Sequence, residues 1–219
     1  MNILLDIDDT LFPSSDFSSL ARKNALNAMI WMGIDEHFDY LYSRLQKIIR
    51  EKGSNCPHHF DELCSRLEIK KPARYVAAAV ASYHDTKTSI QPFPKVPSTL
   101  LKLKADGHRL FIATNGSSIK QWDKLIRLGL ALYFEDVFVS EDIGQEKGQG
   151  FYKEVLSRLG SSARDCVMVG DREDMDIAPA KAVGMRTIRI LKGKHASVPS
   201  IADHVIDEIE KISGILQNF

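Results

Sequence analysis

Short apolar runs alternate with helical patterns along most of this 219-residue chain, and this alternation limits the fold more than any other feature. Between the later runs, apolar residues recur at helical spacing. Strands that alternate with helices predict an α/β fold, a Rossmann-like parallel sheet flanked by helices on both faces. A last helix is expected at about Asp207 to Leu216. The expected strands are Ile3 to Ile7, Arg109 to Thr114, Asp136 to Ser140, Asp165 to Gly170 and Met185 to Ile190.

The interval between the first two runs has a different pattern. From about Ser14 to Ser89 only helical periodicity is found, most clearly in the stripe from Phe38 to Ile49. The segment from Gln91 to Pro97 contains three prolines and reads as a stiff return linker. We therefore expect an α/β core of residues 1–13 and 92–219, with an all-helical domain of residues 14–91 inserted into it.

Composition excludes several classes of protein. The chain carries 29 basic and 29 acidic residues, so no excess of positive charge suggests a nucleic-acid partner. No run of about 18 apolar residues is present, and the first residues lack the basic start of a signal peptide. The three cysteines fit free thiols in a reducing compartment. We expect a cytoplasmic protein with no nucleic-acid or membrane partner, while the oligomeric state stays open.

Acidic side chains follow two of the expected strands, at the point where each strand ends. The first run ends in Asp6 and Asp8, and the fourth is followed by Asp171, Asp174 and Asp176. Carboxyl ends of parallel strands meet at one edge of the sheet, where ligands gather. Two close acids repel each other unless a cation or substrate relieves them, so this edge is a candidate magnesium site. A solvated acidic turn and an acidic helix start are the simpler alternatives.

A hydroxyl and a lysine are expected at the same edge. The second run ends in Thr114, and Asn115 with the following amides could form an anion-binding nest where a helix starts. Lys147 precedes the helix between the third and fourth runs, where a cation could hold a phosphoryl oxygen. A helix N-cap and a surface lysine are the simpler alternatives for each residue alone. Helix capping does not explain why all of these residues converge on one sheet edge.

Four motifs, in this order along the chain, resemble those of the haloacid dehalogenase-like hydrolases. Asp6 to Leu11 looks like motif I, and Ile112 to Gly116 looks like motif II. Lys147 looks like the motif III lysine, and Val167 to Asp171, with Asp176 five residues later, looks like motif IV. The resemblance covers both core segments, and the helical insertion matches the family's C1 cap in position and type.

A narrower likeness concerns the loop after the first strand. The run from Leu11 to Ser15 is similar to the branch of the family that includes pyrimidine 5′-nucleotidases. This likeness rests on few residues.

The resemblance implies a magnesium-dependent phosphatase, a phosphoric monoester hydrolase. Asp6 would attack phosphorus and form an aspartyl-phosphate, and Asp8 would act as general acid and then as general base. An acid at Asp8 argues against dehalogenation, because a leaving halide needs no proton. The expected substrate is a small phosphorylated metabolite, such as a nucleotide or sugar phosphate.

The same resemblance assigns the other site residues by their motif positions. The metal would lie on Asp6, the backbone carbonyl of Asp8, and Asp171, with Asp176 orienting it from a second layer. The residues expected to hold the phosphoryl group are Thr114, the amide of Asn115, and Lys147. The residues expected to border the leaving group are Phe12, Ser14 and Ser15.

One departure from the family pattern follows the lysine. The family usually has Pro and a small polar residue there, but this chain has Gly148, Gln149 and Gly150. Glycine widens the backbone conformations available, so the loop could loosen and shift Lys147. Lys147 is still preferred over Lys153, which would fall inside the following helix.

Other functions remain open at this stage. A phosphomutase shares the aspartate pair, and a catalytically inactive binding module could share the fold. A receiver domain also pairs acids with Thr and Lys, but it would need an acid at the end of the third strand. A zinc site at Cys56, His58 and Cys64 would not match a standard spacing.

Overall fold

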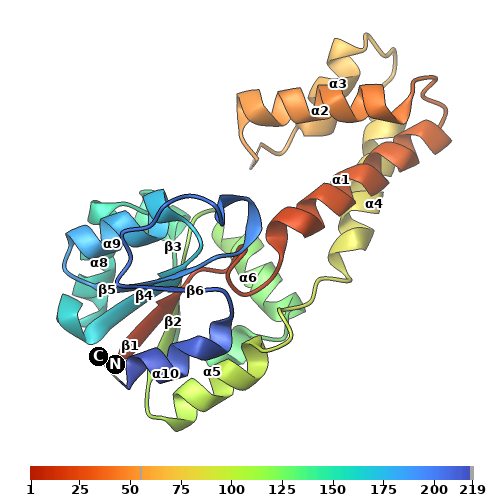
Figure 1. Ribbon diagram of the computed structural model, residues 1–219. Helices are drawn as coiled ribbons and strands as arrows, with labels where there is room; N and C mark the ends of the chain where they lie inside the picture. The colour runs from red at the N-terminus through yellow and green to blue at the C-terminus, as the bar shows by residue number, and fades with distance from the viewer. Residues whose placement is uncertain (55, 218–219) are drawn as a thin grey trace. The chain divides into compact units, whose positions relative to one another are not determined.

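The computed structural model describes residues 1–54 and 56–217 (Figure 1). It divides the chain into two compact units, one made of Met1–Ser15 and Gln91–Phe219 and the other of Asp16–Ile90. These limits lie within two residues of the predicted domain boundaries.

Six parallel strands form one sheet in the first unit. They are β1 (Asn2–Leu5), β2 (Arg109–Thr114), β3 (Asp136–Val139), β4 (Cys166–Gly170), β5 (Arg186–Ile190) and β6 (His204–Ile206). Their order is β3-β2-β1-β4-β5-β6, which places β1 between β2 and β4. In register, Leu4 pairs with Phe111 of β2 and with Met168 of β4. The strand order reverses between β1 and β4, and open α/β sheets bind ligands at such a reversal.

Helices cover both faces of this sheet. They are α5 (Val96–Ala105), α6 (Ser118–Arg127), α7 (Ser140–Ile143), α8 (Gln149–Leu159), α9 (Ala178–Ala182) and α10 (Ile212–Leu216). The connections from β1 to β3 run toward one edge of the sheet, and those from β3 to β5 run toward the other edge. Right-handed crossovers therefore place α5 and α6 on one face and α8 and α9 on the other. Phe151 of α8 and Ala180 of α9 share a buried cluster with Phe111 and Met168 of the sheet. The predicted α/β class with a parallel sheet is confirmed.

The structure corrects several expected element limits. β1 ends at Leu5 rather than Ile7, because a turn begins at Ile7, whose carbonyl accepts the amide of Leu11 at 2.9 Å, and Asp9 in that turn has a positive φ of 51°. β6 was not predicted, since a three-residue strand with one buried residue is too short to show a pattern. The last helix is a 3₁₀ turn at Ile209–Lys211 followed by the short α10. The receiver alternative is wrong, because that fold would place β3 rather than β4 beside β1.

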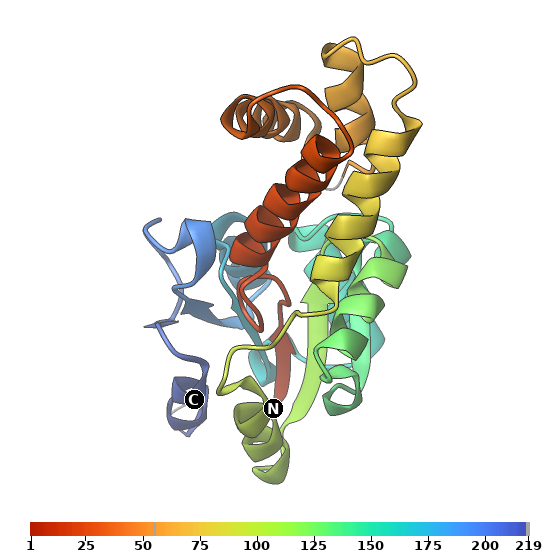
Figure 2. The same cartoon turned by 90° about the vertical axis from the view of Figure 1, so that its right-hand side faces the viewer.

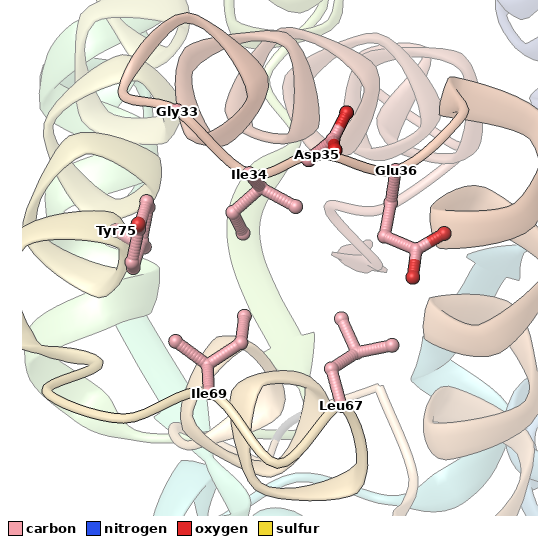
Figure 3. A pocket seen from close by; sticks show the side chains of 7 residues that line it. All are labelled: Gly33, Ile34, Asp35, Glu36, Leu67, Ile69 and Tyr75. Carbon is pink, nitrogen blue, oxygen red and sulfur yellow. The ribbon is translucent and has the colours of Figure 1, made fainter.

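The second unit is all-helical, as predicted. Its helices are α1 (Ser14–Trp31), whose first two residues belong to the first unit, α2 (Phe38–Lys52), α3 (His59–Arg66) and α4 (Ala73–Lys87). α1 and α4 run side by side in both views, and Asn24 donates a hydrogen bond of 3.1 Å to Thr86 between them (Figure 2). Leu26, Leu45 and Cys64 lie in its buried core. Across the described residues, none of the helices has the length and apolar character needed to span a membrane.

Candidate active site

Three buried carboxylates meet at the carboxyl ends of β1 and β4. Asp6 follows β1, Asp171 follows β4, and Asp176 lies in a π-helical turn, Glu173–Ile177. A carboxylate oxygen from each lies within 4.8 Å of the other two. Asp176 has no exposed surface, and the other two residues are at most 5% exposed. Of the five acids expected at this edge, the structure therefore brings these three together.

Lys147 is the cation that faces this carboxylate cluster. Its Nζ lies 2.8 Å from Asp6 Oδ1 and 2.5 Å from Asp176 Oδ1, and it donates to the carbonyl of Ala113 at 3.3 Å. Its backbone amide donates to Asn115 Oδ1 at 2.7 Å. The lysine is thus held at its backbone and at its ammonium group, beside the predicted nucleophile.

The charges in this cluster do not balance. Burial raises the pKa of Asp6 to about 6, although the Lys147 ammonium opposes the change. Burial also raises the pKa of Asp171 to about 8, and the negative charges of Asp6 and Asp176 add to this effect. Burial disfavours the charged form of Lys147 too, but the two neighbouring carboxylates outweigh burial and raise its pKa above the usual range. Among the described residues, Lys147 forms ion pairs with Asp6 and Asp176, and no ion pair reaches Asp171, so the cluster holds more carboxylates than paired cations.

This excess charge and the all-oxygen donor set fit a hard divalent cation. The structure brings Asp6 and Asp171, two predicted metal ligands, into one group with Asp176. Both oxygens of Asp176 also contact protein groups, since Oδ1 faces Lys147 and Oδ2 accepts the amide of Arg172 at 3.0 Å. This arrangement supports the predicted orienting role for Asp176, which stays a prediction, as does metal binding by the Asp8 carbonyl.

Gly170 makes room for Asp176. A Cβ atom added at Gly170 would lie only 2.2 Å from Asp176 Oδ2, so a larger residue would have to displace the carboxylate. The π-helical turn that follows the strand carries Asp176 back against this glycine. Single π-helical turns occur often at functional sites, where they re-aim a side chain.

Asp8 points to a different lysine. Both of its carboxylate oxygens lie 2.7 Å from Lys124 Nζ on α6. The Asp8 side chain is 40% exposed and that of Lys124 is 20% exposed. Asp8 lies in the loop that follows β1, because the strand has already ended at Leu5.

The loop after β1 is held by its own side chains. The backbone of Asp8 bridges to Phe12, and the amide of Asp9 donates to the Phe12 carbonyl at 3.0 Å. The buried Asp9 carboxylate accepts hydrogen bonds from both the amide and the hydroxyl of Ser15. The amide of Ser14 donates to the Phe12 carbonyl at 2.8 Å. Contact of Phe12, Ser14 and Ser15 with a leaving group stays a prediction.

The end of β2 forms the wall next to Lys147. Thr114 is buried at the last position of the strand, and Asn115 follows and contacts the Lys147 amide. The Gln121 side chain on α6 donates to the carbonyl of Asn115, and a Cβ at Gly116 would meet that side chain at 2.7 Å. Thr114, Asn115 and Lys147 are therefore brought to one place, while their contact with phosphate stays a prediction.

The glycines after Lys147 do not move the lysine out of the site. Gly148 has an extended backbone with φ of −168°, which any residue can adopt. A Cβ at Gly150 would meet the end of the exposed Gln145 side chain, which can move aside. Lys153 lies on α8 and is exposed, whereas Lys147 contacts the carboxylate cluster, so the geometry favours Lys147, and its phosphate-binding role stays a prediction.

Two other acidic or thiol groups lie outside the site. Asp174 is exposed and pairs with Arg172 at 3.0 Å, away from the carboxylate cluster. Cys64 is buried in the helical core, and burial raises the pKa of its thiol to about 11. In residues 1–54 and 56–217, no group of three possible metal ligands includes Cys56, His58 and Cys64.

Two residues near the site were not found from the sequence. Lys124 looked like an ordinary surface lysine on a helix. Arg189 lies inside β5 with no exposed side-chain surface and donates to the carbonyl of Asp171 at 3.1 Å. An arginine between two isoleucines, Ile188 and Ile190, in an expected buried strand is a signal that could have identified it.

The fold and the site together define a parallel α/β core with a buried carboxylate cluster at the strand reversal. Residues 3–190 match the family model described as haloacid dehalogenase-like hydrolase. The chain belongs to this family, which confirms the resemblance drawn from the four motifs.

The comparisons also identify phosphatases among the relatives. Relatives named glyceraldehyde 3-phosphate phosphatase are 38–42% identical. The one from Methanocaldococcus jannaschii shares 41% identity over 99% of this chain and 96% of its own. A pyrimidine 5′-nucleotidase from Escherichia coli is 26% identical over 84% of this chain and 83% of its own, so the nucleotidase likeness is present but weaker. The prediction of a phosphatase is confirmed.

A solved structure shares the same fold. The phosphatase of this family from Thermococcus onnurineus matches with a TM-score of 0.71 at 24% identity, covering 98% of this chain and 97% of its own. This match confirms the predicted core with its inserted helices.

Proposed function

We propose that this protein is a magnesium-dependent phosphatase that hydrolyses a small sugar-type phosphate through an aspartyl-phosphate on Asp6. The observation that supports this best is the buried Asp6 carboxylate at the strand reversal, in contact with Lys147 and grouped with Asp171 and Asp176. A nucleophile in that place has both a cation and oxygen ligands for a metal beside it.

The reaction has two halves. In the first, an oxygen of Asp6 attacks phosphorus in line, and the bond from phosphorus to the leaving oxygen breaks as Asp8 gives that oxygen its proton. In the second, the Asp8 carboxylate takes a proton from water, and the water oxygen attacks phosphorus. The bond from phosphorus to Asp6 then breaks, which restores the carboxylate and releases phosphate.

The remaining residues stabilise charge, which is the main task in phosphoryl transfer. Lys147 would face an oxygen of the transferring group, with Thr114 and the amide of Asn115 at the end of β2. Held by Asp6 and Asp171, Mg²⁺ would offset the repulsion between the attacking carboxylate and the phosphate dianion.

Glyceraldehyde 3-phosphate is the first substrate to test, because relatives with about two fifths of their residues identical carry the name of its phosphatase. It is a small phosphorylated metabolite, the class of substrate that the sequence predicts. We further propose that the helical unit, Asp16–Ile90, acts as the family's cap domain and selects the substrate. This role rests on where the unit is inserted in the chain, directly after the loop that follows β1.

The test is phosphate release from glyceraldehyde 3-phosphate and from 4-nitrophenyl phosphate, with Mg²⁺ or with a chelator. Wild type should release phosphate only with the metal, and Asp6→Asn should lower the rate by about 10⁴-fold or more. Asp174→Asn is the matched control, because Asp174 is exposed and lies outside the cluster. Metal-independent release, or full activity in Asp6→Asn, would refute the proposal. Isomerisation of a sugar phosphate without phosphate release would indicate a phosphomutase instead.

A further inference from the structure

The Asp8–Lys124 pair is the part of the site that the family motifs do not explain. Lys124 lies in the last turn of α6, and its Nζ is 2.7 Å from each oxygen of Asp8. The same ammonium lies 5.9 Å from the centre of the Phe12 ring, and Phe12 forms the backbone bridge to Asp8. Lys124 therefore contacts the loop that carries Asp8 at two points.

The position of this pair is suited to catalysis. Asp8 lies two residues after Asp6, in the loop that follows β1. Lys147 is already committed to Asp6 and Asp176, which leaves Lys124 as the cation that faces Asp8. When a carboxylic acid gives up its proton, negative charge appears on its oxygens, and a cation already in place stabilises that charge without reorganisation.

We propose that Lys124 is a positioning residue for Asp8. Its ammonium fixes the direction of the Asp8 carboxylate and stabilises the negative charge that develops there as the proton passes to the leaving oxygen. This inference rests on the proposed function, in which Asp8 is the general acid.

A structural alternative exists for the same lysine. A cation in the last turn of a helix is favoured by the helix dipole, whatever it contacts. That role would affect folding and would not depend on the chemistry of the leaving group. The two roles therefore differ in how a substitution changes the dependence of rate on the leaving group.

The experiment compares phenyl phosphate with 4-nitrophenyl phosphate, two probes of similar shape. Phenolate is the poorer leaving group, so it depends more on proton donation. The measured quantity is kcat/KM, which includes only steps up to formation of the phosphoenzyme. The variants are Lys124→Met, Lys124→Arg and, as a matched control on the same helix, Lys120→Met, whose side chain is exposed.

Lys124→Met should lower kcat/KM for phenyl phosphate by about 10- to 100-fold, because general acid catalysis typically contributes about 10²- to 10⁴-fold. The same variant should lower kcat/KM for 4-nitrophenyl phosphate by less than about threefold. Lys124→Arg should recover most of the loss, and Lys120→Met should match wild type. Equal losses on both probes, or no loss on either, would overturn the inference while leaving the proposed function intact. A folded wild type that releases no phosphate from any ester would overturn both.

Discussion

Two lysine–aspartate pairs in this molecule have the same chemistry but different surroundings. Lys147 contacts Asp6 inside the protein, where the lysine side chain is 4% and the aspartate side chain 8% exposed. Lys124 contacts Asp8 in a more exposed place, where the lysine side chain is 20% and the aspartate side chain 40% exposed. We call this second pair the rim pair. Removing one partner of a buried pair leaves a charge without solvent, whereas an exposed pair loses little when broken. In the proposed mechanism, the buried pair therefore holds the Asp6 nucleophile in place. The rim pair leaves the Asp8 carboxyl free to give up and take back a proton.

The largest effect is expected at the buried pair. Lys147→Met should destabilise the metal-free protein by about 3–5 kcal/mol, because it leaves Asp6 and Asp176 buried without their cation. The measurement is chemical unfolding in the presence of a chelator, with Lys153→Met as the control, since Lys153 is exposed on α8. A loss below about 1 kcal/mol, as for a surface pair, would show that the comparison is wrong.

The next effect concerns the excess negative charge of the cluster. Mg²⁺ should raise the unfolding free energy by about 2.7 kcal/mol when its concentration is 100 times its dissociation constant, because it binds the folded state only. Thermal unfolding with increasing Mg²⁺ measures this without any substrate. Asp171→Asn should reduce the response strongly, whereas Asp174→Asn should keep it. An equal response in both variants would mean that the cation binds somewhere else.

A smaller effect tests the space around Asp176. Gly170→Ala should cost about 1–3 kcal/mol, the usual range for overpacking, because the added Cβ would lie 2.2 Å from Asp176 Oδ2. It should also slow phosphate release, since the displaced carboxylate contacts Lys147. Gly148→Ala is the control, because its nearest contact would be 3.7 Å and its backbone is extended. If both variants unfold at the same denaturant concentration as wild type, the close approach at Gly170 has no energetic consequence.

The difference between the two pairs also separates what the sequence could predict from what it could not. Asp6 and Asp171 each follow an apolar strand, and parallel strands bring their carboxyl ends to one edge whatever the details of packing. Asp176 and Lys147 occupy motif positions that the structure brings to the same edge. Strand topology therefore places Asp6 and Asp171, whereas Asp176 and Lys147 are placed by the resemblance to the family motifs.

Lys124 could not be placed in this way. Which face of α6 turns toward the site depends on how that helix packs on the sheet, and a lysine one turn from Lys120 looks like any surface lysine. The end of β1 at Leu5 was also missed. The turn that follows it includes a positive φ at Asp9, and such a turn leaves no mark in the spacing of apolar residues. The substrate could not be predicted beyond its class, because the motifs describe the phosphoryl group and not what is attached to it.

The smallest effect is expected at the rim pair. In a double-mutant cycle with Asp8→Asn and Lys124→Met, the coupling free energy for unfolding should be below about 1 kcal/mol, because both charges reach solvent. The coupling should fall further at high salt, which screens exposed charges and affects buried ones much less. A coupling of about 3 kcal/mol that resists salt would make Lys124 a structural counterpart of Lys147. In that case the fixed Asp8 carboxylate would be a poor proton donor. A positioning residue is instead identified by two results together, a small effect of the pair on stability and a large effect of Lys124→Met on how the rate depends on the leaving group.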